Sequence, residues 1–388
     1  MFINLQAAYW MIAVLITLMI ILMGITLGIK VNKKLSAKKE NDCLDDFHSY
    51  LYYLQVQLDN QAMLRPPKKT LSSFEKKVLQ NTLLPWIERL KGVHREKLLT
   101  LCEDIGLNHY NKRRLQSPWS MVRLDAAYNL GILRDQEVTS QLMSLLYRSN
   151  FDSSVYIIAR SIAQTSDNPG EIKDLVLYLV NNGKQHPHLI ADISKESSLD
   201  LRPVYIQFLY EDNSKLNKIG LIGLQEQVNE EIPEIVHSSI KSEDKEIRML
   251  ALQLCMSAMA LTEKDVKYYL QFPDWEIRNL FADWIGYSGL IQYTELLKER
   301  IQDSNWIVSR TTAKSLAQLG EHGFEILCQT AAGVHGERGR ETAEEYLKEK
   351  LKQTIDNLSQ VEDITEYNQK VFMYQKYFGK SYDLINAL

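Results

Sequence analysis

Cysteine, proline and glycine are scarce in this chain of 388 residues, which contains 4, 9 and 17 of them. Low proline and glycine contents argue against long disordered stretches and against a β protein rich in tight turns. The cysteines are Cys43, Cys102, Cys255 and Cys328, and no two have the close spacing of a zinc site. We therefore predict a globular protein in a reducing compartment, without a disulfide framework.

Sequence motifs of catalysis are also missing. The chain contains no GxxxxGKS phosphate loop, no GxGxxG fingerprint, no GxSxG nucleophile elbow and no HExxH metal motif. The close histidine pair His186 and His188 flanks Pro187, which favours a solvated loop over a metal site. The glycine-rich stretch Gly333–Glu341 could hold an anion, but a plain loop is the better interpretation because no apolar strand precedes it. We predict a non-enzymatic protein with no catalytic, cofactor-binding or metal-binding residues.

Charge is distributed unevenly along the chain. Residues 30–116 carry 17 Lys and Arg against 10 Asp and Glu, whereas residues 117–320 carry 20 against 27 and residues 321–388 carry 8 against 12. Nucleic-acid binding requires a surplus of basic residues, and the acidic balance of residues 117–320 works against it. We therefore expect no nucleic-acid partner.

The one long uncharged run covers residues 7–29. About 20 apolar residues in a helix span the hydrocarbon core of a bilayer, so this run is long enough to cross it. No lysine or arginine precedes the run, and five lysines follow at once: Lys30, Lys33, Lys34, Lys38 and Lys39. The positive-inside rule then places residues 1–6 outside and the rest of the chain in the cytoplasm. A cleavable signal peptide is disfavoured because no basic n-region is present.

Two further segments lead into the main part of the chain. Residues 30–64 form a juxtamembrane segment, expected to be either a stalk helix or a first helix packed on the following domain. Its lysines would attract anionic lipid, although a topology signal explains them equally well. Residues 65–116 are predicted to form an irregular helical cap. Within it, Ser72 and Glu75 make a capping box, and Pro85 is expected to kink or restart the helix.

A short pattern recurs along residues 117–320. It combines a polar or aromatic turn, a β-branched residue followed by arginine, and alanine and leucine at helical spacing. The copies lie at Ser117–Gly131, Ser242–Cys255, Asp274–Gly286 and Asp303–Gly320. Ile247 and Ile277 are 30 residues apart, and Ile277 and Val308 are 31 apart. Self-similarity of this period predicts a solenoid of helix pairs, each of which buries its apolar face against its neighbours.

The pattern resembles the HEAT-repeat superfamily in its short bacterial form, D-x-x-V-R-x-x-A-A-x-x-L-G. The resemblance covers a little over half of the chain and implies an all-α solenoid. It implies little about function, because HEAT arrays carry many unrelated roles. One HEAT-fold hydroxylase family binds iron through His-Glu dipeptides, and this sequence has none. Lyase relatives of these repeats stay open as an alternative.

Within each copy we expect the residues of the motif to be structural. Turn residues such as Asp274 and Asp303 should accept hydrogen bonds from free N–H groups of the following helix. The motif arginines Arg123, Arg248 and Arg278 are expected to reach the aspartate of an adjacent repeat, forming an Asp–Arg ladder. A row of substrate-binding arginines is the alternative. Residues 181–201 are less regular and indicate a loop or a distorted helix pair.

Aromatic residues supply the candidate partner-binding groups. Trp119, Trp275 and Trp306 lie at repeat turns, although burial between repeats is the favoured interpretation of each. Residues 321–388 are predicted to form a helical cap, with a capping box at Thr342 and Glu345. The aromatic-rich tail that follows includes Tyr374, Tyr377 and Phe378. It either caps the last repeat or docks a partner, and the cap is favoured.

These observations predict an all-α protein, an α-solenoid of HEAT-like helix pairs with a single N-terminal transmembrane helix. We expect a scaffold at the cytoplasmic face of a bacterial inner membrane, whose acidic groove binds a membrane-associated protein partner. The predicted transmembrane helix is the one feature that suggests a cell-envelope synthesis or transport complex. The alternatives are an enzyme or lyase-type subunit that uses the groove, and a sensor that reads lipid through the lysines. The oligomeric state stays open.

Overall fold

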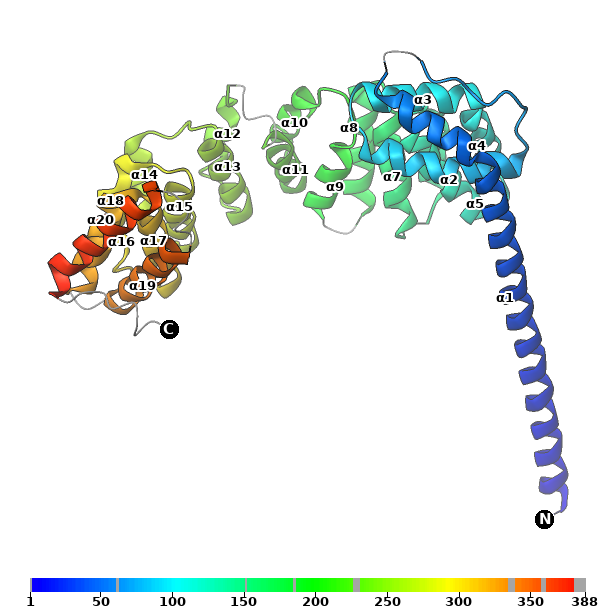
Figure 1. Ribbon diagram of the computed structural model, residues 1–388, viewed down its shortest axis with the longest axis horizontal. Helices are drawn as coiled ribbons and strands as arrows, with labels where there is room; N and C mark the ends of the chain where they lie inside the picture. Colours follow the sequence, from blue (N-terminus) through cyan, green and yellow to red (C-terminus); the bar gives the residue numbers. More distant parts are fainter. Residues whose placement is uncertain are drawn as a thin grey trace. The chain divides into compact units, whose positions relative to one another are not determined.

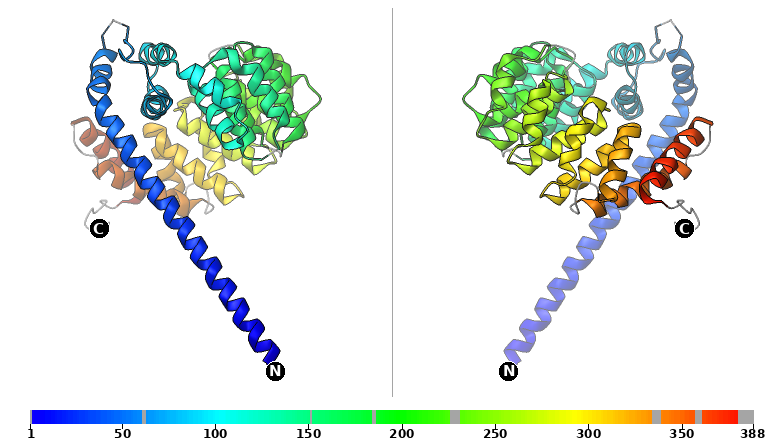
Figure 2. Two further views of the ribbon diagram at one scale, coloured as in Figure 1. Left: turned by 90° about the vertical axis from the view of Figure 1, so that its right-hand side faces the viewer. Right: turned by 90° about the vertical axis from the view of Figure 1, so that its left-hand side faces the viewer.

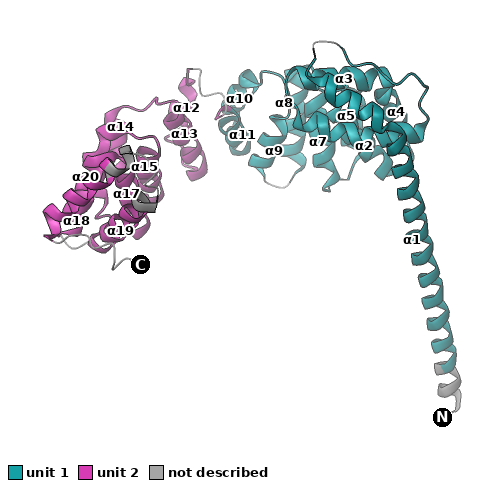
Figure 3. Cartoon of the chain, in the orientation of Figure 1, with its two compact units in different colours: residues 1–223 teal, residues 224–388 magenta. Residues whose placement is uncertain are grey.

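The computed structural model describes residues 2–60, 63–150, 152–183, 186–225, 231–333, 339–356 and 361–379. In these ranges the chain forms 20 α-helices and two short 3-10 helices, and no strand. The all-helical prediction is therefore confirmed. The chain divides into two compact units, residues 1–223 and residues 224–388 (Figure 3). The boundary between the units lies within residues 117–320, which the sequence predicts to be one continuous solenoid.

Unit 1 contains helices α1 to α11 (Figure 1). Their bounds are α1 Phe2–Leu58, α2 Ser73–Arg89, α3 Val93–Ile105, α4 Leu107–Leu115, α5 Ser120–Ile132, α6 Thr139–Arg148, α7 Ser154–Thr165, α8 Pro169–Asn182, α9 Pro187–Ser194, α10 Arg202–Leu209 and α11 Ser214–Leu224, with a 3-10 turn at Gln136–Val138.

Unit 2 contains helices α12 to α20. Their bounds are α12 Glu234–Ser239, α13 Lys245–Ser257, α14 Glu263–Leu270, α15 Trp275–Tyr287, α16 Thr294–Arg300, α17 Trp306–Gln318, α18 Gly320–Ala331, α19 Arg340–Asp356 and α20 Val361–Phe378, with a 3-10 turn at Ile291–Tyr293.

Helix α1 is a single helix of 57 residues with two different halves. Its N-terminal half extends away from the other helices of unit 1 (Figure 2), and the side chains of residues 9–39 are exposed. This half contains a window of mean hydropathy 2.8, so α1 is long and apolar enough to cross a membrane. The C-terminal half packs on α2 and α3. The predicted stalk and the predicted first packing helix are thus the same helix.

The packed end of α1 enters the core of unit 1. Cys43 and Phe47 contact Val78 and Leu79 of α2. Leu54 joins a buried cluster that includes Leu83 and Ile87 of α2 and Leu98, Leu101 and Cys102 of α3. Burying these apolar side chains supplies the main free energy that holds α1 in place, at about 25 cal/mol per Å² of apolar surface.

The C-terminus of α1 is closed by two side chains of α3. Lys97 Nζ donates to the carbonyl oxygen of Leu58 at 2.9 Å and also to that of Asn60. His94 Nδ1 lies 2.9 Å from the same Leu58 oxygen. The last carbonyls of a helix have no partners inside the helix, and a cation there also matches the negative end of the helix dipole.

Helix α2 confirms one local prediction and excludes one of the two alternatives of another. The Ser72 side chain accepts from Glu75 N, and Glu75 Oε2 accepts from Ser72 N, so the predicted capping box is present. Pro85 does not restart the helix, because α2 runs through it to Arg89. A proline removes one helical hydrogen bond. Buried contacts of Leu83, Leu84 and Ile87 on both sides of Pro85 hold the helix together.

Residues 181–201 are more helical than a loop. They contain the end of α8 and the short helix α9, which begins at Pro187. The loop interpretation of the histidine pair was therefore wrong for His188, which lies in the first turn of α9. The physical reason is that proline at the first position of a helix costs no hydrogen bond and starts the helix with a suitable φ.

The motif recurs as a structural repeat. The motif helices α5, α13, α15 and α17 each have 13 residues. Each is followed by a residue of positive φ 14 positions after its first residue, at Arg134, Met259, Gly289 and Gly320. Hydrogen bonds from Ala260 N to Cys255 O (2.9 Å) and from Leu290 N to Ile285 O (3.0 Å) close two of these ends. Such a bond and a left-handed residue define the Schellman ending of a helix.

The motif glycine allows neighbouring helices to approach closely. A Cβ atom on Gly131 of α5 would lie 2.9 Å from Ser161 Cα of α7. A Cβ on Gly286 of α15 would lie 2.5 Å from Ser315 Cβ of α17. The same packing contact thus occurs in both units, and a larger residue at either glycine would force the two helices apart.

The C-terminal helix α20 packs on α18 within unit 2. Tyr377 OH donates to Glu325 Oε1 at 2.8 Å and accepts from Gln329 Nε2 at 3.1 Å. Tyr374 and Phe378 stack with ring centroids 4.5 Å apart. These contacts favour the cap over a free docking segment. The end of the aromatic tail, residues 380–388, lies outside the described residues.

The predicted capping box of the preceding helix was wrong. Helix α19 already begins at Arg340, so Thr342 lies in its first turn and not at its N-cap. Gly339, with a φ of 80°, precedes the helix and leaves room for the backbone of Ile301. Most of the glycine-rich stretch Gly333–Glu341, interpreted above as a plain loop, lies outside the described residues, at residues 334–338.

Candidate partner-binding surfaces

The motif arginines hold the turns that precede their own helices. Arg123 Nη1 donates to Ser117 O and Pro118 O, both at 2.9 Å. Arg248 Nη1 donates to Ser242 O at 2.7 Å and Glu243 O at 2.9 Å, and Arg278 Nη1 donates to Phe272 O and Pro273 O at the same two distances. An arginine four residues into the helix therefore satisfies two carbonyls that the turn leaves free.

The predicted Asp–Arg ladder forms at one step in the described residues. Arg278 donates from Nε and Nη2 to the two carboxylate oxygens of Asp303, both at 2.8 Å. Asp303 lies three residues before α17, and Phe272 occupies the corresponding place before α15. Arg248 Nε is therefore buried without a hydrogen-bond partner. For Arg123 the corresponding place is residue 151, outside the described residues.

The fourth copy differs at the arginine position. Ser309 is the fourth residue of α17, and its hydroxyl donates to Ile301 O at 2.6 Å. Arg310 follows it and pairs with Glu345 of α19 at 3.1 Å. Here a short hydroxyl replaces the guanidinium, and the arginine next to it binds another helix.

The electrostatics of the Arg278–Asp303 pair keep both groups charged. Burial alone would raise the pKa of Asp303, but its hydrogen bonds from Arg278 and from Asn305 N hold the pKa below the ordinary value. The hydrogen bond to Asp303 in turn raises the pKa of Arg278. A bidentate charged pair of this kind is strong and geometrically specific. Its role is to fasten α15 to the turn before α17.

The predicted turn aspartates have different roles. Asp274 is the N-cap of α15, accepts from Glu276 N at 3.0 Å and pairs with Lys245 at 3.2 Å. The prediction for Asp274 is therefore confirmed. Asp303 is not an N-cap, because Asn305 caps α17, but it accepts from the backbone N–H of Asn305 at 2.9 Å.

Two of the predicted tryptophans are exposed. Trp119 is 74% exposed and Trp306 is 70% exposed, so the prediction that these two side chains are buried between repeats was wrong. Trp119 is the N-cap of α5 and Trp306 the first residue of α17, positions where a side chain lies beyond the packed face of the helix. Trp275 is half-buried at the start of α15. Exposed aromatic side chains are candidate contacts for a partner.

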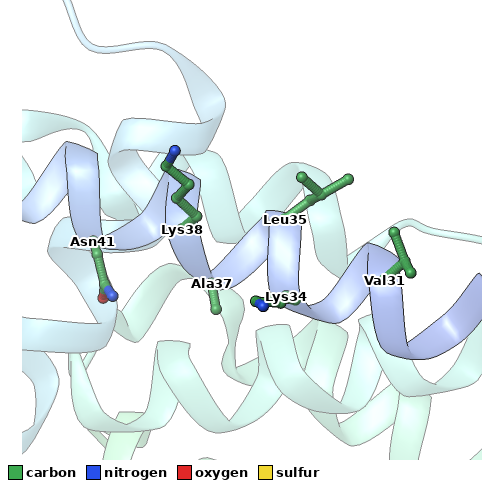
Figure 4. A pocket seen from close by; sticks show the side chains of 6 residues that line it. All are labelled: Val31, Lys34, Leu35, Ala37, Lys38 and Asn41. Atoms are coloured by element: carbon green, nitrogen blue, oxygen red, sulfur yellow. The ribbon is translucent and has the colours of Figure 1, made fainter.

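The five lysines of α1 form a second candidate surface. All are exposed, and within the described ranges none has an acidic partner. Figure 4 shows Lys34 and Lys38 on the same stretch of helix as Val31 and Leu35. Long lysine side chains with apolar neighbours suit the boundary between a bilayer and water.

A third surface could not be predicted from the motif. A polar cavity of about 730 Å³ lies between the start of α5, α6 and the turn before α7. Arg123, Arg148 and Asp152 contribute its charged groups. Arg148 and Asp152 stand outside the repeated pattern, so nothing in the motif places them beside Arg123.

Comparison with known proteins leaves the family open. No family model matches the chain, and no curated protein matches it. In the described part of the chain, no three His, Cys, Asp or Glu side chains are grouped as a metal site would require. The resemblance to HEAT repeats therefore stays a prediction from the motif.

Proposed function

We propose that this protein is a membrane-anchored scaffold, a HEAT-like solenoid that holds a protein partner at the cytoplasmic face of a bacterial inner membrane. The observation that carries the proposal is the continuity of α1. One uninterrupted helix contains the exposed apolar segment and the end that packs into unit 1. An anchor built in this way holds unit 1 at a fixed place relative to the apolar segment.

The exposed half of α1 supports the membrane part of the proposal. None of the residues in its most apolar window is buried. Exposing such a surface to water is unfavourable, by about 25 cal/mol per Å², and a bilayer would remove that cost. The lysines that follow support a cytoplasmic location for the helical domain.

The repeated helices support the scaffold part. All four motif helices share their length and a positive φ after their ends, and three of them share the arginine–carbonyl contacts, as expected of one unit used several times. The exposed tryptophans at two repeat turns are the groups that we expect to touch the partner. Aromatic residues at the centre of an interface contribute much of its binding energy.

The anchor is tested by fractionation and labelling. The full chain should stay in membranes after a high-salt wash, and a chain without residues 2–40 should be soluble with unchanged helicity. For orientation, a membrane-impermeant maleimide should label Asn4→Cys in intact cells and Lys241→Cys only after lysis. The native cysteines are buried and give little background. The opposite labelling pattern would contradict the proposed orientation.

Partner binding is tested by photo-crosslinking in native membranes. A photoreactive amino acid in place of Trp119 or Trp306 should capture a discrete membrane protein. Tyr210 is a matched control, because it is 69% exposed but stands outside the motif. If no protein is captured at either tryptophan, or if the control captures the same proteins, the scaffold proposal is wrong.

A further inference from the structure

The polar cavity of unit 1 has the size and composition of a binding site. Its volume of about 730 Å³ falls within the range of ligand pockets, about 300–1,000 Å³. Eleven of its 13 lining residues are polar. They include Gln141 and Asn150, whose amides each offer both a donor and an acceptor.

The cavity has a surplus of positive charge. Arg123 binds two backbone carbonyls through Nη1, and among the described residues no carboxylate pairs with its guanidinium. Arg148 is exposed and has no hydrogen bond or ion pair in the described residues. The one acid, Asp152, accepts from Ser154 N at 2.8 Å, and its bonds to Ser154 lower its pKa, so it stays charged. Two cations against one anion stand out in a region whose net charge is negative.

This surplus is specific to the first copy of the motif. Asp244 and Asp274 cap α13 and α15, which places a carboxylate at the turn that Arg248 or Arg278 closes. Trp119 occupies the corresponding position before α5. The tryptophan therefore removes a competing negative charge and adds an exposed aromatic ring next in sequence to Ser120, which lines the cavity.

The chemistry of the lining favours a peptide. Guanidinium groups bind carboxylates through paired hydrogen bonds. The amides of Gln141 and Asn150 match peptide groups, and Asp152 can accept a peptide N–H but would repel a phosphate dianion. On either side of the lining residue Ser120, Trp119 and Met121 are 74% and 75% exposed and offer an apolar contact.

We propose that this cavity binds an acidic peptide segment of the partner protein. Arg123 and Arg148 bind a carboxylate of the segment, and Trp119 and Met121 contact an adjacent apolar side chain. This inference rests on the proposed partner binding and assigns it a site and a ligand chemistry.

The test uses the full-length protein in nanodiscs of zwitterionic lipid. The probes are two pools of capped hexapeptides with randomised flanks, one with Asp-Glu at its centre and one with the isosteric Asn-Gln. We expect enrichment of the acidic pool over the amide pool. For the best acidic peptide, Arg148→Gln should weaken binding about tenfold, which corresponds to about 1.4 kcal/mol. Arg160→Gln is the matched control, because Arg160 is exposed on α7 and does not line the cavity.

Other outcomes would overturn the inference. Equal enrichment of both pools, or acidic binding unchanged by Arg148→Gln, would exclude a carboxylate site. Binding of inorganic phosphate or of vesicles with anionic lipid, dependent on Arg148 and without peptide enrichment, would assign the cavity to another anion. Arg148→Gln could leave crosslinking of the membrane partner at Trp306 intact while no peptide is enriched. That result would support the scaffold proposal and exclude this cavity as the peptide site. If the protein that keeps Arg148 gives no crosslink at Trp119 or at Trp306, the scaffold proposal itself is contradicted.

Discussion

The ammonium nitrogen of Lys97 lies 2.9 Å from the carbonyl oxygen of Leu58, and this contact joins the end of α1 to α3. Lys97 is itself buried, so its charge is stabilised mainly by backbone oxygens at the end of α1. A buried cation with no carboxylate beside it is costly unless such acceptors are present. The contact therefore depends on α1 being docked.

We expect Lys97→Met to loosen α1. The substitution keeps the apolar stem but removes the charged hydrogen bonds, which contribute about 1.5–3 kcal/mol each in proteins. The free energy of unfolding should fall by about 2 kcal/mol. Hydrogen exchange should rise along residues 43–58 but not in α17. The exposed Lys91→Met is the control, and equal exchange in both variants would show that Lys97 does not hold the helix.

The Arg278–Asp303 pair should be the most costly motif contact to break. Asp303→Asn leaves the Arg278 guanidinium without its carboxylate, and breaking a buried pair costs about 3–5 kcal/mol. We expect a loss toward the lower end, because Arg278 keeps two carbonyl acceptors. Denaturant unfolding measures it. In a double-mutant cycle with Arg278→Met the two losses should be far from additive, and additivity would refute a direct coupling.

The positive φ at the ends of the motif helices predicts opposite effects of glycine. Met259 has a φ of 53°, a conformation that costs a residue with a side chain about 1 kcal/mol, so Met259→Gly should stabilise the protein by about that amount. Gly289 has a φ of 63°, and Gly289→Ala should destabilise it to a similar extent. Ser257→Gly, at the last residue of α13, is the control and should be destabilising, because the serine there has the ordinary helical conformation. If Met259→Gly instead destabilised the protein, the contacts of the Met259 side chain would contribute more than its positive φ costs.

The four cysteines should resist thiol reagents in the native protein. Burial raises the pKa of Cys102 to about 12, of Cys255 to about 11 and of Cys328 to about 12, which leaves little thiolate at neutral pH. All four should react in denaturant. Cys43 on α1 should react first under native conditions, and faster in Lys97→Met, because undocking of α1 exposes it. Rapid native labelling of Cys255 or Cys328 would contradict the packing of unit 2.

The capping box of α2 should weaken in acid. Hydrogen bonds from Lys69 and from Ser72 lower the pKa of Glu75 to about 2, whereas the unfolded chain titrates near the ordinary value of 4.5. A lowered folded-state pKa gives stability that is present above the unfolded pKa and is lost as the pH falls through the folded one. The difference in unfolding free energy between wild type and Glu75→Gln should therefore shrink from pH 5 to pH 2. The size of the change is set by the difference between the folded and unfolded pKa values of Glu75. A constant difference would rule out the carboxylate as its cause.

Local rules predicted much of the helical framework. The capping box at Ser72 and the recurrence of the motif follow from side-chain chemistry within one or two turns. These features need no knowledge of distant contacts, which is why the sequence alone indicates them.

Other features depend on neighbours that a motif does not specify. The ladder stops at Arg248 because Phe272, and not an aspartate, lies three residues before α15. Pro85 stays inside α2 because helices on both sides support it. The cavity beside Arg123 requires Arg148 and Asp152 from other elements. Each of these is decided by tertiary packing, which overrides local preference.

The length of α1 also gives it a mechanical role. At 1.5 Å per residue its 57 residues reach about 85 Å, and no described residue within it breaks the helix. The apolar end and the docked end must therefore turn as one body. A change of 10° in the tilt of the apolar end would swing the docked end through about 15 Å, by the same rise per residue. In the proposed anchored state, thinning or thickening of the bilayer around α1 would therefore reposition unit 1.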